Sequence, residues 1–135
     1  ISAPQRTASA SNDAGNLIAE ARMAMLLQRV ARGADAMSAR EALEIATLGG
    51  AQVLGRDDLG PIEPGKRADL AIWDLMGIEA AGSWDPVAAL ALCGPTRVKT
   101  LIVEGRQVVR DGQMVTLNLG AVLDRQRRLA ARLAG

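Results

Sequence analysis

The residue types that most often carry catalysis are scarce in this sequence. Its 135 residues contain no histidine and a single cysteine, Cys93. These residues therefore hold no histidine metal ligand, no Ser-His-Asp or Cys-His nucleophile system and no histidine general base. One cysteine also excludes an internal disulfide and a cysteine-based zinc cluster. Because Cys93 lies between apolar residues and Gly94, with no histidine to activate it, we expect a buried, structural thiol.

Carboxylates are the remaining side chains that could hold a metal ion. The candidates are Asp57, Asp58, Asp69, Asp74 and Asp85. Their spacing matches neither a clustered Asp-x-Asp pattern nor an EF-hand loop, so the sequence predicts no metal site among them. We expect Asp69 to bond to nearby backbone groups instead and to cap a turn.

The charges are balanced, with 16 basic and 15 acidic residues and a net charge of +1. This balance gives no bulk attraction to nucleic acid or to an anionic membrane. The last segment carries four arginines, but Asp124 lies among them and no aromatic residues interleave. No apolar stretch reaches the roughly 18 residues that cross a bilayer, and the first residues lack the pattern of a signal peptide. We expect a cytoplasmic protein that binds neither nucleic acid nor membrane.

The first part of the chain is predicted to be helical. Ser11, Asn12 and Asp13 are candidate N-caps for a helix over residues 14–32, which Gly33 would end. The sequence Ser-x-x-Glu at residues 38–41 is a capping box that opens a second helix over residues 39–54. The glycine pair inside this helix, at residues 49–50, would allow close packing against another backbone. Apolar stripes at helical spacing comprise Leu17, Ala21, Ala24, Met25 and Gln28 in the first helix and Ala42, Ile45, Ala46, Gly49 and Val53 in the second.

Short strands follow from about Gly55 onward. We predict strands over residues 68–75, 98–103, 107–110 and 114–117, a brief helix over 85–92 and a last helix over 120–133. The last helix is predicted to have Val122, Gln126, Leu129 and Leu133 on one line. Turns are predicted at residues 64–65 and 104–105. With no Phe or Tyr, small and aliphatic side chains must fill the core, and we expect Trp73 and Trp84 to be core or interface anchors.

The most informative stretch is residues 60–70, which read Gly-Pro-Ile-Glu-Pro-Gly-Lys-Arg-Ala-Asp-Leu. It resembles the signature near the C-terminus of amidohydrolase-superfamily enzymes, where the chain enters a β-sandwich beside a TIM-like barrel. Residues 46–51, 98–105 with 108–112, and 9–13 with 20–22 also resemble segments of that superfamily. Residues 9–13, 85–89 and 92–95 are most similar to 8-oxoguanine deaminases and hydroxyatrazine or chlorotriazine hydrolases.

The resemblance implies an α/β fold class, as an α+β fragment. It implies an irregular arm at residues 1–10, the last helices of a TIM-like barrel at 11–55, part of a small β-sandwich at 56–119 and a C-terminal helix at 120–135. A TIM barrel alone takes about 250 residues, so we expect the chain to be the C-terminal piece of a longer enzyme.

The activity implied by the resemblance is hydrolysis of a non-peptide carbon–nitrogen bond. In the intact parent this would be deamination of a purine-like or triazine heterocycle, with a divalent metal, zinc or iron, that activates water. The family's metal site uses several histidines and a late aspartate, whose position falls on Thr7 here. The resemblance therefore gives this chain no metal ligand and no catalytic residue. It places Ser11, Asn12 and Asp13 near the substrate, although Asp13 also suits a helix N-cap.

Two interpretations stay open at this level. In the first, the chain is part of a hydrolase and is inactive by itself, without a cofactor of its own. In the second, it is a non-catalytic structural or oligomerisation module derived from an amidohydrolase. Apolar helix faces and sheet edges would then be exposed, so we expect a homo-oligomer. Whether the chain is a natural protein or a truncated piece, which heterocycle the parent uses and whether another chain supplies the metal-binding half are open questions.

Overall fold

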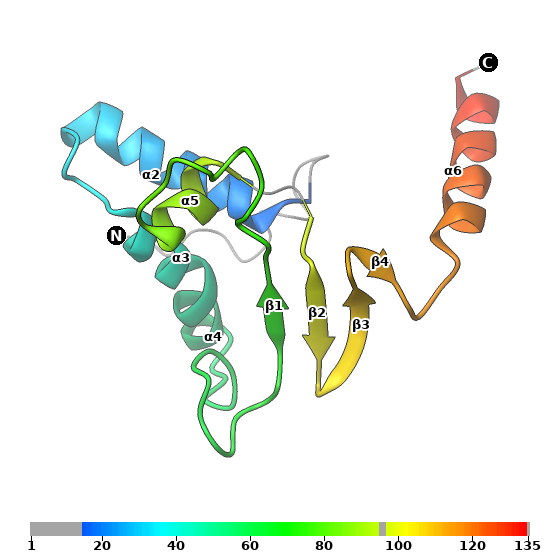
Figure 1. Ribbon diagram of the computed structural model, residues 1–135, viewed down its shortest axis with the longest axis horizontal. Helices are drawn as coiled ribbons and strands as arrows, with labels where there is room; N and C mark the ends of the chain where they lie inside the picture. Colours follow the sequence, from blue (N-terminus) through cyan, green and yellow to red (C-terminus); the bar gives the residue numbers. More distant parts are fainter. Residues whose placement is uncertain (1–14, 95–96, 135) are drawn as a thin grey trace. The chain divides into compact units, whose positions relative to one another are not determined.

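The computed structural model describes residues 15–94 and 97–134, which form helices and one antiparallel sheet (Figure 1). The expected mixture of helix and strand is confirmed. The chain divides into two compact units, which we describe separately. The first comprises the described residues of 1–67 and 73–96, and the second those of 68–72 and 97–135. The boundaries expected at residues 10, 55 and 119 stay predictions.

Helix α2 (Leu17–Arg32) opens the first unit. Its N-cap is Asn16, whose side chain accepts a hydrogen bond from the Ala19 amide at 3.2 Å. The helix therefore begins three residues later than the predicted residue 14, because a cap closer to the apolar stripe is present. The candidate caps Ser11, Asn12 and Asp13 lie outside the described residues. The predicted stop is confirmed, since the Gly33 amide donates to the Arg29 carbonyl at 2.9 Å.

The second predicted helix consists of three consecutive segments, α3 (Ala39–Glu44), a π-helical turn η1 (Ile45–Gly49) and α4 (Gly50–Val53). The capping box is confirmed: the Glu41 amide donates to Ser38 Oγ at 3.2 Å, and the Ser38 amide donates to Glu41 Oε2 at 2.7 Å. This backbone bond from Ser38, with a second from its hydroxyl, lowers the pKa of Glu41. A Cβ at Gly50 would meet nothing within 4 Å, so the described chain brings no other backbone against this glycine.

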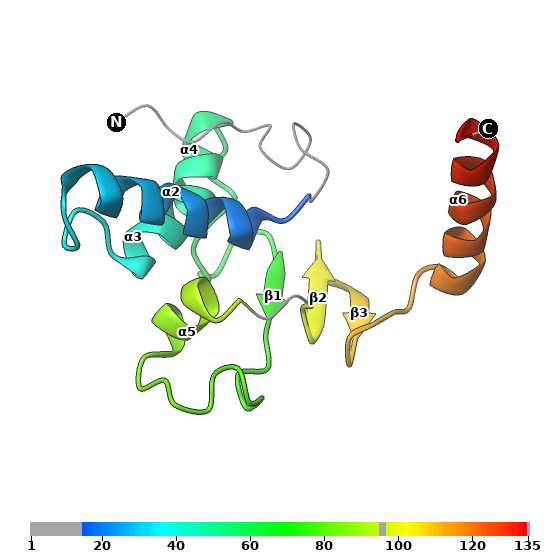
Figure 2. The ribbon, with the colours of Figure 1, turned by 90° about the horizontal axis from the view of Figure 1, so that it is seen from above.

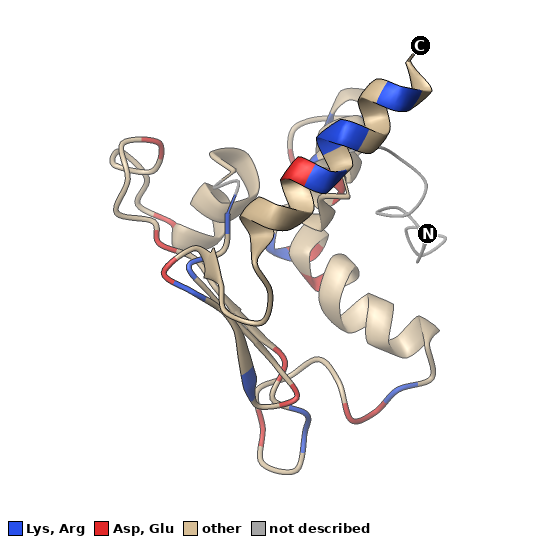
Figure 3. Ribbon diagram, turned by 90° about the vertical axis from the view of Figure 1, so that its right-hand side faces the viewer, with Lys and Arg blue, Asp and Glu red and all other residues tan. Residues whose placement is uncertain are grey.

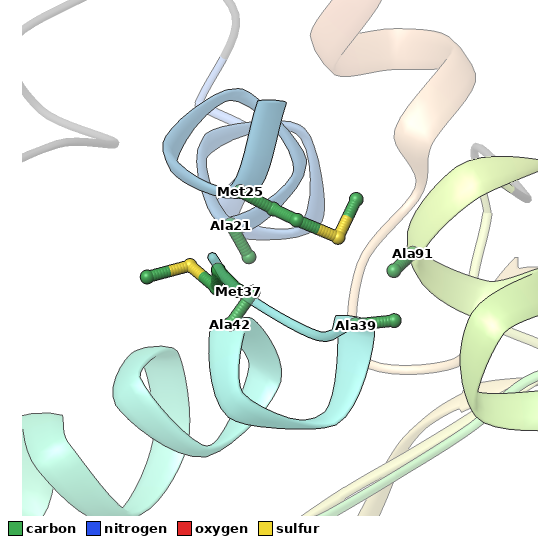
Figure 4. Packing of buried hydrophobic residues seen from close by; sticks show 6 residues of the cluster. All are labelled: Ala21, Met25, Met37, Ala39, Ala42 and Ala91. Atoms are coloured by element: carbon green, nitrogen blue, oxygen red, sulfur yellow. The ribbon is translucent and has the colours of Figure 1, made fainter. Parts of the chain in front are cut away.

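The core of the first unit lies where α2, α3 and α5 (Pro86–Leu92) meet, as Figures 1 and 2 show. Asp85 caps α5, because its side chain accepts from the Val87 amide at 2.8 Å. Figure 4 shows the buried cluster, which comprises Ala21, Met25, Met37, Ala39, Ala42 and Ala91. The expectation that small and aliphatic side chains fill the core is therefore confirmed, since the cluster consists of alanines and methionines.

The second unit contains a four-stranded antiparallel sheet in the order β1-β2-β3-β4. Its strands are β1 (Leu70–Ile72), β2 (Thr100–Val103), β3 (Arg106–Arg110) and β4 (Gln113–Met114). The predicted strands over 68–75, 98–103 and 114–117 are too long. The register of β1 explains why the strand predicted over residues 68–75 is shorter. Strand β1 pairs with β2 only from Leu70 opposite Ile102 to Ile72 opposite Thr100. The turn between β2 and β3 is confirmed at Glu104 (φ +50°) and Gly105 (φ +77°), the positive φ pair of a tight hairpin.

The last helix, α6 (Leu119–Leu133), starts one residue earlier than predicted. Asn118 caps it by accepting from the Ala121 amide at 3.1 Å. None of its residues is buried, including the predicted line that contains Val122 and Leu129.

One expectation about burial is wrong. Cys93 is exposed, because it is the C-cap that follows α5 and so lies beyond the helical residues that pack against α2 and α3. Trp84 is expected to be a core or interface anchor; it is fully exposed in the loop before α5, so it is no core anchor of the described chain, and the interface role stays a prediction. Trp73 is half-buried and directly follows β1.

Candidate functional site

The residues predicted to lie near a substrate, Ser11, Asn12 and Asp13, are outside the described residues, as is Thr7, the position of the expected metal-binding aspartate. The structure does describe residues 60–70, which carry the most informative resemblance. We refer to them as the 60–70 stretch. Its contacts show what these residue types do in this chain.

The first half of the 60–70 stretch contains two glycines, Gly60 and Gly65, that have different roles. Gly60 has φ +112°, and a Cβ there would meet Leu48 Cδ2 at 2.7 Å, so only glycine lets the chain pass this close to η1. Gly65 has φ +88° and follows Pro64 in a turn closed by the Lys66 amide, which donates to the Glu63 carbonyl at 3.1 Å. The predicted turn at residues 64–65 is therefore confirmed.

The middle of the stretch binds the preceding loop through Asp58. Arg56 donates to Asp58 with Nε at 2.5 Å and with Nη2 at 2.6 Å, and Arg67 Nε donates at 2.7 Å. The Arg67 amide also donates to the Asp58 carbonyl at 2.8 Å, and Lys66 Nζ donates to the Asp57 carbonyl. The Arg56 guanidinium, together with that of Arg67, holds the pKa of Asp58 well below its usual range. Asp58 is thus a fixed carboxylate that closes a loop.

The end of the stretch binds the hairpin of the second unit. Asp69 Oδ1 accepts from the Glu104 amide at 2.6 Å, and the Ala68 carbonyl accepts from the Gly105 amide at 3.0 Å. The expectation that Asp69 caps the turn beside it is wrong, because its side chain binds a turn 35 residues away. This bond holds Glu104 in a left-handed conformation that few residues other than Gly, Asn and Asp adopt. No local pattern in the chain indicates this pairing.

Two of the remaining candidate carboxylates, Asp74 and Asp85, also have local structural partners. Asp74 accepts from the Met76 amide at 3.0 Å, and Asp85 caps α5. Within residues 15–94 and 97–134, no three His, Cys, Asp or Glu side chains come together in a way that could hold a metal ion. Chemically, the arrangement around the 60–70 stretch can position a loop and a hairpin. It offers neither a nucleophile with its base nor a ligand set for a metal.

Exposed apolar side chains are the other prominent feature. Among the large hydrophobic residues that are at least 85% exposed are Val30, Ile62, Met76, Ile78, Trp84 and Leu133. Where such side chains gather into one contiguous patch, they commonly mark a surface that another segment or molecule covers. No helix in the described part of the chain combines the length and the hydropathy that crossing a membrane requires.

Relatives of this chain agree on one class of enzyme. The 8-oxoguanine deaminase of Pseudomonas aeruginosa is 46% identical over 125 residues, which are 93% of this chain and 28% of that protein. A 5-methylthioadenosine/S-adenosylhomocysteine deaminase of Desulforudis audaxviator is 39% identical over 92% of this chain and 30% of its own length. The chain thus spans less than a third of the length of the curated relatives that it matches.

Two solved structures also match most of this chain. The zinc complex of atrazine chlorohydrolase TrzN from Arthrobacter aurescens TC1 matches 90% of this chain with 28% of its own, at a TM-score of 0.82 and 38% identity. An adenosine deaminase from Xanthomonas campestris with bound zinc matches 87% of this chain with 28% of its own, at a TM-score of 0.78 and 29% identity.

The family model described as "Amidohydrolase family" matches residues 3–108, well over half of the sequence. This match confirms the resemblance that the 60–70 stretch indicates. The chain belongs to the amidohydrolase family.

Proposed function

We propose that this chain is the C-terminal part of an enzyme that hydrolyses a carbon–nitrogen bond of a purine-like or triazine heterocycle. The observation that carries the proposal is the 46% identity to an 8-oxoguanine deaminase over 93% of the chain. The 38% identity to a triazine hydrolase supports the same substrate class. In such a deamination, the oxygen of water replaces nitrogen on a ring carbon, and ammonia or an amine leaves.

Within this enzyme, the chain would supply structure. We assign α2, α3, η1 and α4 to the last helices of a TIM-like barrel, β1 to β4 to part of a small β-sandwich, and α6 to the C-terminal helix. A TM-score of 0.82 over 90% of the chain supports this assignment. The exposure of Leu27 and Val30 on α2 also supports this assignment, since other parts of a barrel would cover such side chains.

The metal belongs to the whole enzyme in this proposal. Two of the structural neighbours are zinc-bound, which supports a divalent metal, zinc or iron, in the whole protein. The carboxylates described here do not fit that role, because Asp58 is paired with two arginines, and Asp69, Asp74 and Asp85 bind backbone amides. We therefore propose that this chain alone holds no catalytic metal, contributes no catalytic residue and has no deaminase activity. Ser11, Asn12 and Asp13 remain its predicted substrate-proximal residues.

A second candidate function, a homo-oligomerisation module, is favoured by the exposed apolar side chains. Ile78, Trp84 and Leu133 are 89%, 101% and 90% exposed in the single chain. Burying such groups against a second copy would release the free energy that apolar contact with water costs. A location in the cytoplasm stays a prediction from the sequence.

Ammonia release tests the first proposal. The whole protein, expressed from the coding sequence that contains this chain, is incubated with 8-oxoguanine and with aminated triazines, next to the 135-residue chain with and without added zinc or iron. We expect ammonia or amine release from at least one heterocycle by the whole protein and none above the blank by the chain. No release by the whole protein would refute the proposed hydrolytic activity. Metal-dependent release by the chain would refute the proposal that the chain alone is inactive.

A further inference from the structure

The five methionines of the chain differ widely in their exposure to solvent. Met25 and Met37 are 0% and 7% exposed and belong to the core cluster of the first unit, as Figure 4 shows. Met114 in β4 is half-buried, and Met23 on α2 is 56% exposed. Met76 is 90% exposed. A small reagent that attacks thioether sulfur therefore has free access to Met76, whereas it reaches the core methionines only when the core opens.

Met76 lies in the loop between β1 and α5, residues 73–85, which we call the 73–85 loop. The backbone at Met76 is fixed by a local turn, because its amide donates to Asp74 Oδ1 at 3.0 Å. The three residues that follow it, 77–79, are exposed as well. All of these residues belong to the first unit. The loop therefore holds the Met76 thioether in solvent without burying it against the core of its own unit.

The charges close to Met76 in the sequence are all negative. Residues 68–96 contain no lysine or arginine, but they contain four carboxylates, at Asp69, Asp74, Glu79 and Asp85 (Figure 3). Carboxylates repel an anionic oxidant, whereas hydrogen peroxide is uncharged at neutral pH and is not repelled. The surroundings of Met76 therefore fit an uncharged hydroperoxide as the reagent.

We propose that Met76 is a modification site at which hydroperoxides form methionine sulfoxide. The thioether sulfur attacks one peroxide oxygen, the O–O bond breaks, and a sulfur–oxygen bond forms. The proton of the transferred oxygen passes to the leaving oxygen, which departs as water when the oxidant is hydrogen peroxide. Sulfur loses two electrons and the peroxide gains them. Methionine sulfoxide reductases reverse such a modification. This inference depends neither on the enzymatic activity nor on the oligomeric state proposed above.

The fold tolerates a sulfoxide at Met76 but not at the core methionines. The sulfoxide group is polar, and at Met76 it stays in contact with water. At Met25 the same group would lie among the alanines of the core cluster, where a polar group without a hydrogen-bond partner is costly. Oxidation confined to Met76 should therefore leave the urea midpoint of the chain unchanged.

A time course with hydrogen peroxide, read by mass spectrometry of proteolytic fragments, tests the proposal on the 135-residue chain. The chain carries Cys93→Ser, because the exposed thiol would also consume peroxide. Met76 should be oxidised fastest, and at least about tenfold faster than Met25 and Met37. In urea the five methionines should react at similar rates, because unfolding exposes all of them. Loss of the added mass on treatment with methionine sulfoxide reductases A and B identifies the product as the sulfoxide.

Two leucine variants provide the controls. Met76→Leu should abolish the fastest phase and leave the rates at the other methionines unchanged, whereas the matched variant Met23→Leu should leave the rate at Met76 unchanged. Oxidation of Met23 or Met114 in the folded chain as fast as that of Met76 would overturn the proposal. So would an added mass that the reductases do not remove, or a urea midpoint that falls when only Met76 is oxidised.

Discussion

Met25 is the largest side chain that the described part of the protein buries completely, at 0% exposure. We predict that Met25→Ala lowers the free energy of unfolding by about 3 kcal/mol, within the usual range of about 2–5 kcal/mol for truncating a buried Met, Leu or Ile. The neighbouring side chains explain why the cost is not smaller. Ala21, Ala42 and Ala91 have only a methyl group each and cannot move into the space that the lost thioether leaves.

Met23 provides a matched control on the same helix. It lies two residues before Met25 in α2 and is 56% exposed. Met23→Ala changes the same atoms and gives the same gain in helix propensity, but it opens no cavity. We expect its effect to stay within about 0.5 kcal/mol. The difference between the two variants in the free energy of unfolding therefore measures the effect of burying the methionine side chain.

Urea unfolding followed by circular dichroism measures both variants against the wild-type chain. The Met25 variant should unfold at a lower urea concentration with an unchanged slope, and its Tm should fall by about 10 °C or more. If the two variants differ by less than about 0.5 kcal/mol, the meeting point of α2, α3 and α5 is not the core, and the packing described here is wrong.

Three further predictions concern single polar side chains. Asp69→Ala removes the acceptor of the Glu104 amide and should lower the free energy of unfolding by about 1 kcal/mol, with faster hydrogen exchange at that amide; unchanged exchange would contradict the bond. Ser38→Ala breaks the capping box with Glu41 and should cost about 1 kcal/mol in a thermal melt, and a cost near zero would show that the cap does not stabilise α3. Folding lowers the pKa of Asp58, so the folded chain binds fewer protons at this carboxyl than the unfolded chain does. The ionised Asp58 therefore stabilises the fold above about pH 4, and this stabilisation is lost as the pH falls further. Urea midpoints of Asp58→Asn should accordingly depend less on pH below about pH 4 than those of wild type, and equal dependence would refute the ion pairs.

The features that could be predicted from the sequence are those set by residues close together in the chain. The capping box of Ser38 and Glu41, the stop at Gly33 and the turn at Glu104 and Gly105 each depend on local backbone chemistry. The apolar stripe of α2 correctly identified Ala21 and Met25, because helical spacing fixes which residues share a face.

The features that could not be predicted depend on which partner a residue meets. Cys93 has apolar neighbours in sequence, yet it is exposed, because α5 ends at Leu92 and Cys93 lies past the residues that pack against α2 and α3. The length of β1 is set by its register with β2, which nothing within residues 68–75 specifies. The bond between Asp69 and Glu104 joins residues 35 positions apart, and no spacing rule reaches that far.

For the candidate site, too, the local features could be predicted from the sequence and the distant contacts could not. The 60–70 stretch could be singled out from its residue pattern, and its turn could be predicted from Pro64 and Gly65. Its actual role, in which Arg67 binds Asp58 and Asp69 binds a distant hairpin, required the structure. The predicted substrate-proximal residues, Ser11, Asn12 and Asp13, lie outside the described residues and stay predictions.

We propose that this chain is the C-terminal part of a heterocycle-hydrolysing amidohydrolase and has no such activity by itself. Ammonia release from 8-oxoguanine tests it most directly, with the zinc- or iron-loaded whole protein and the 135-residue chain assayed next to each other. We expect release by the whole protein and none above the blank by the chain. Release by the chain itself, or none by the whole protein on 8-oxoguanine and on the related triazines, would contradict it.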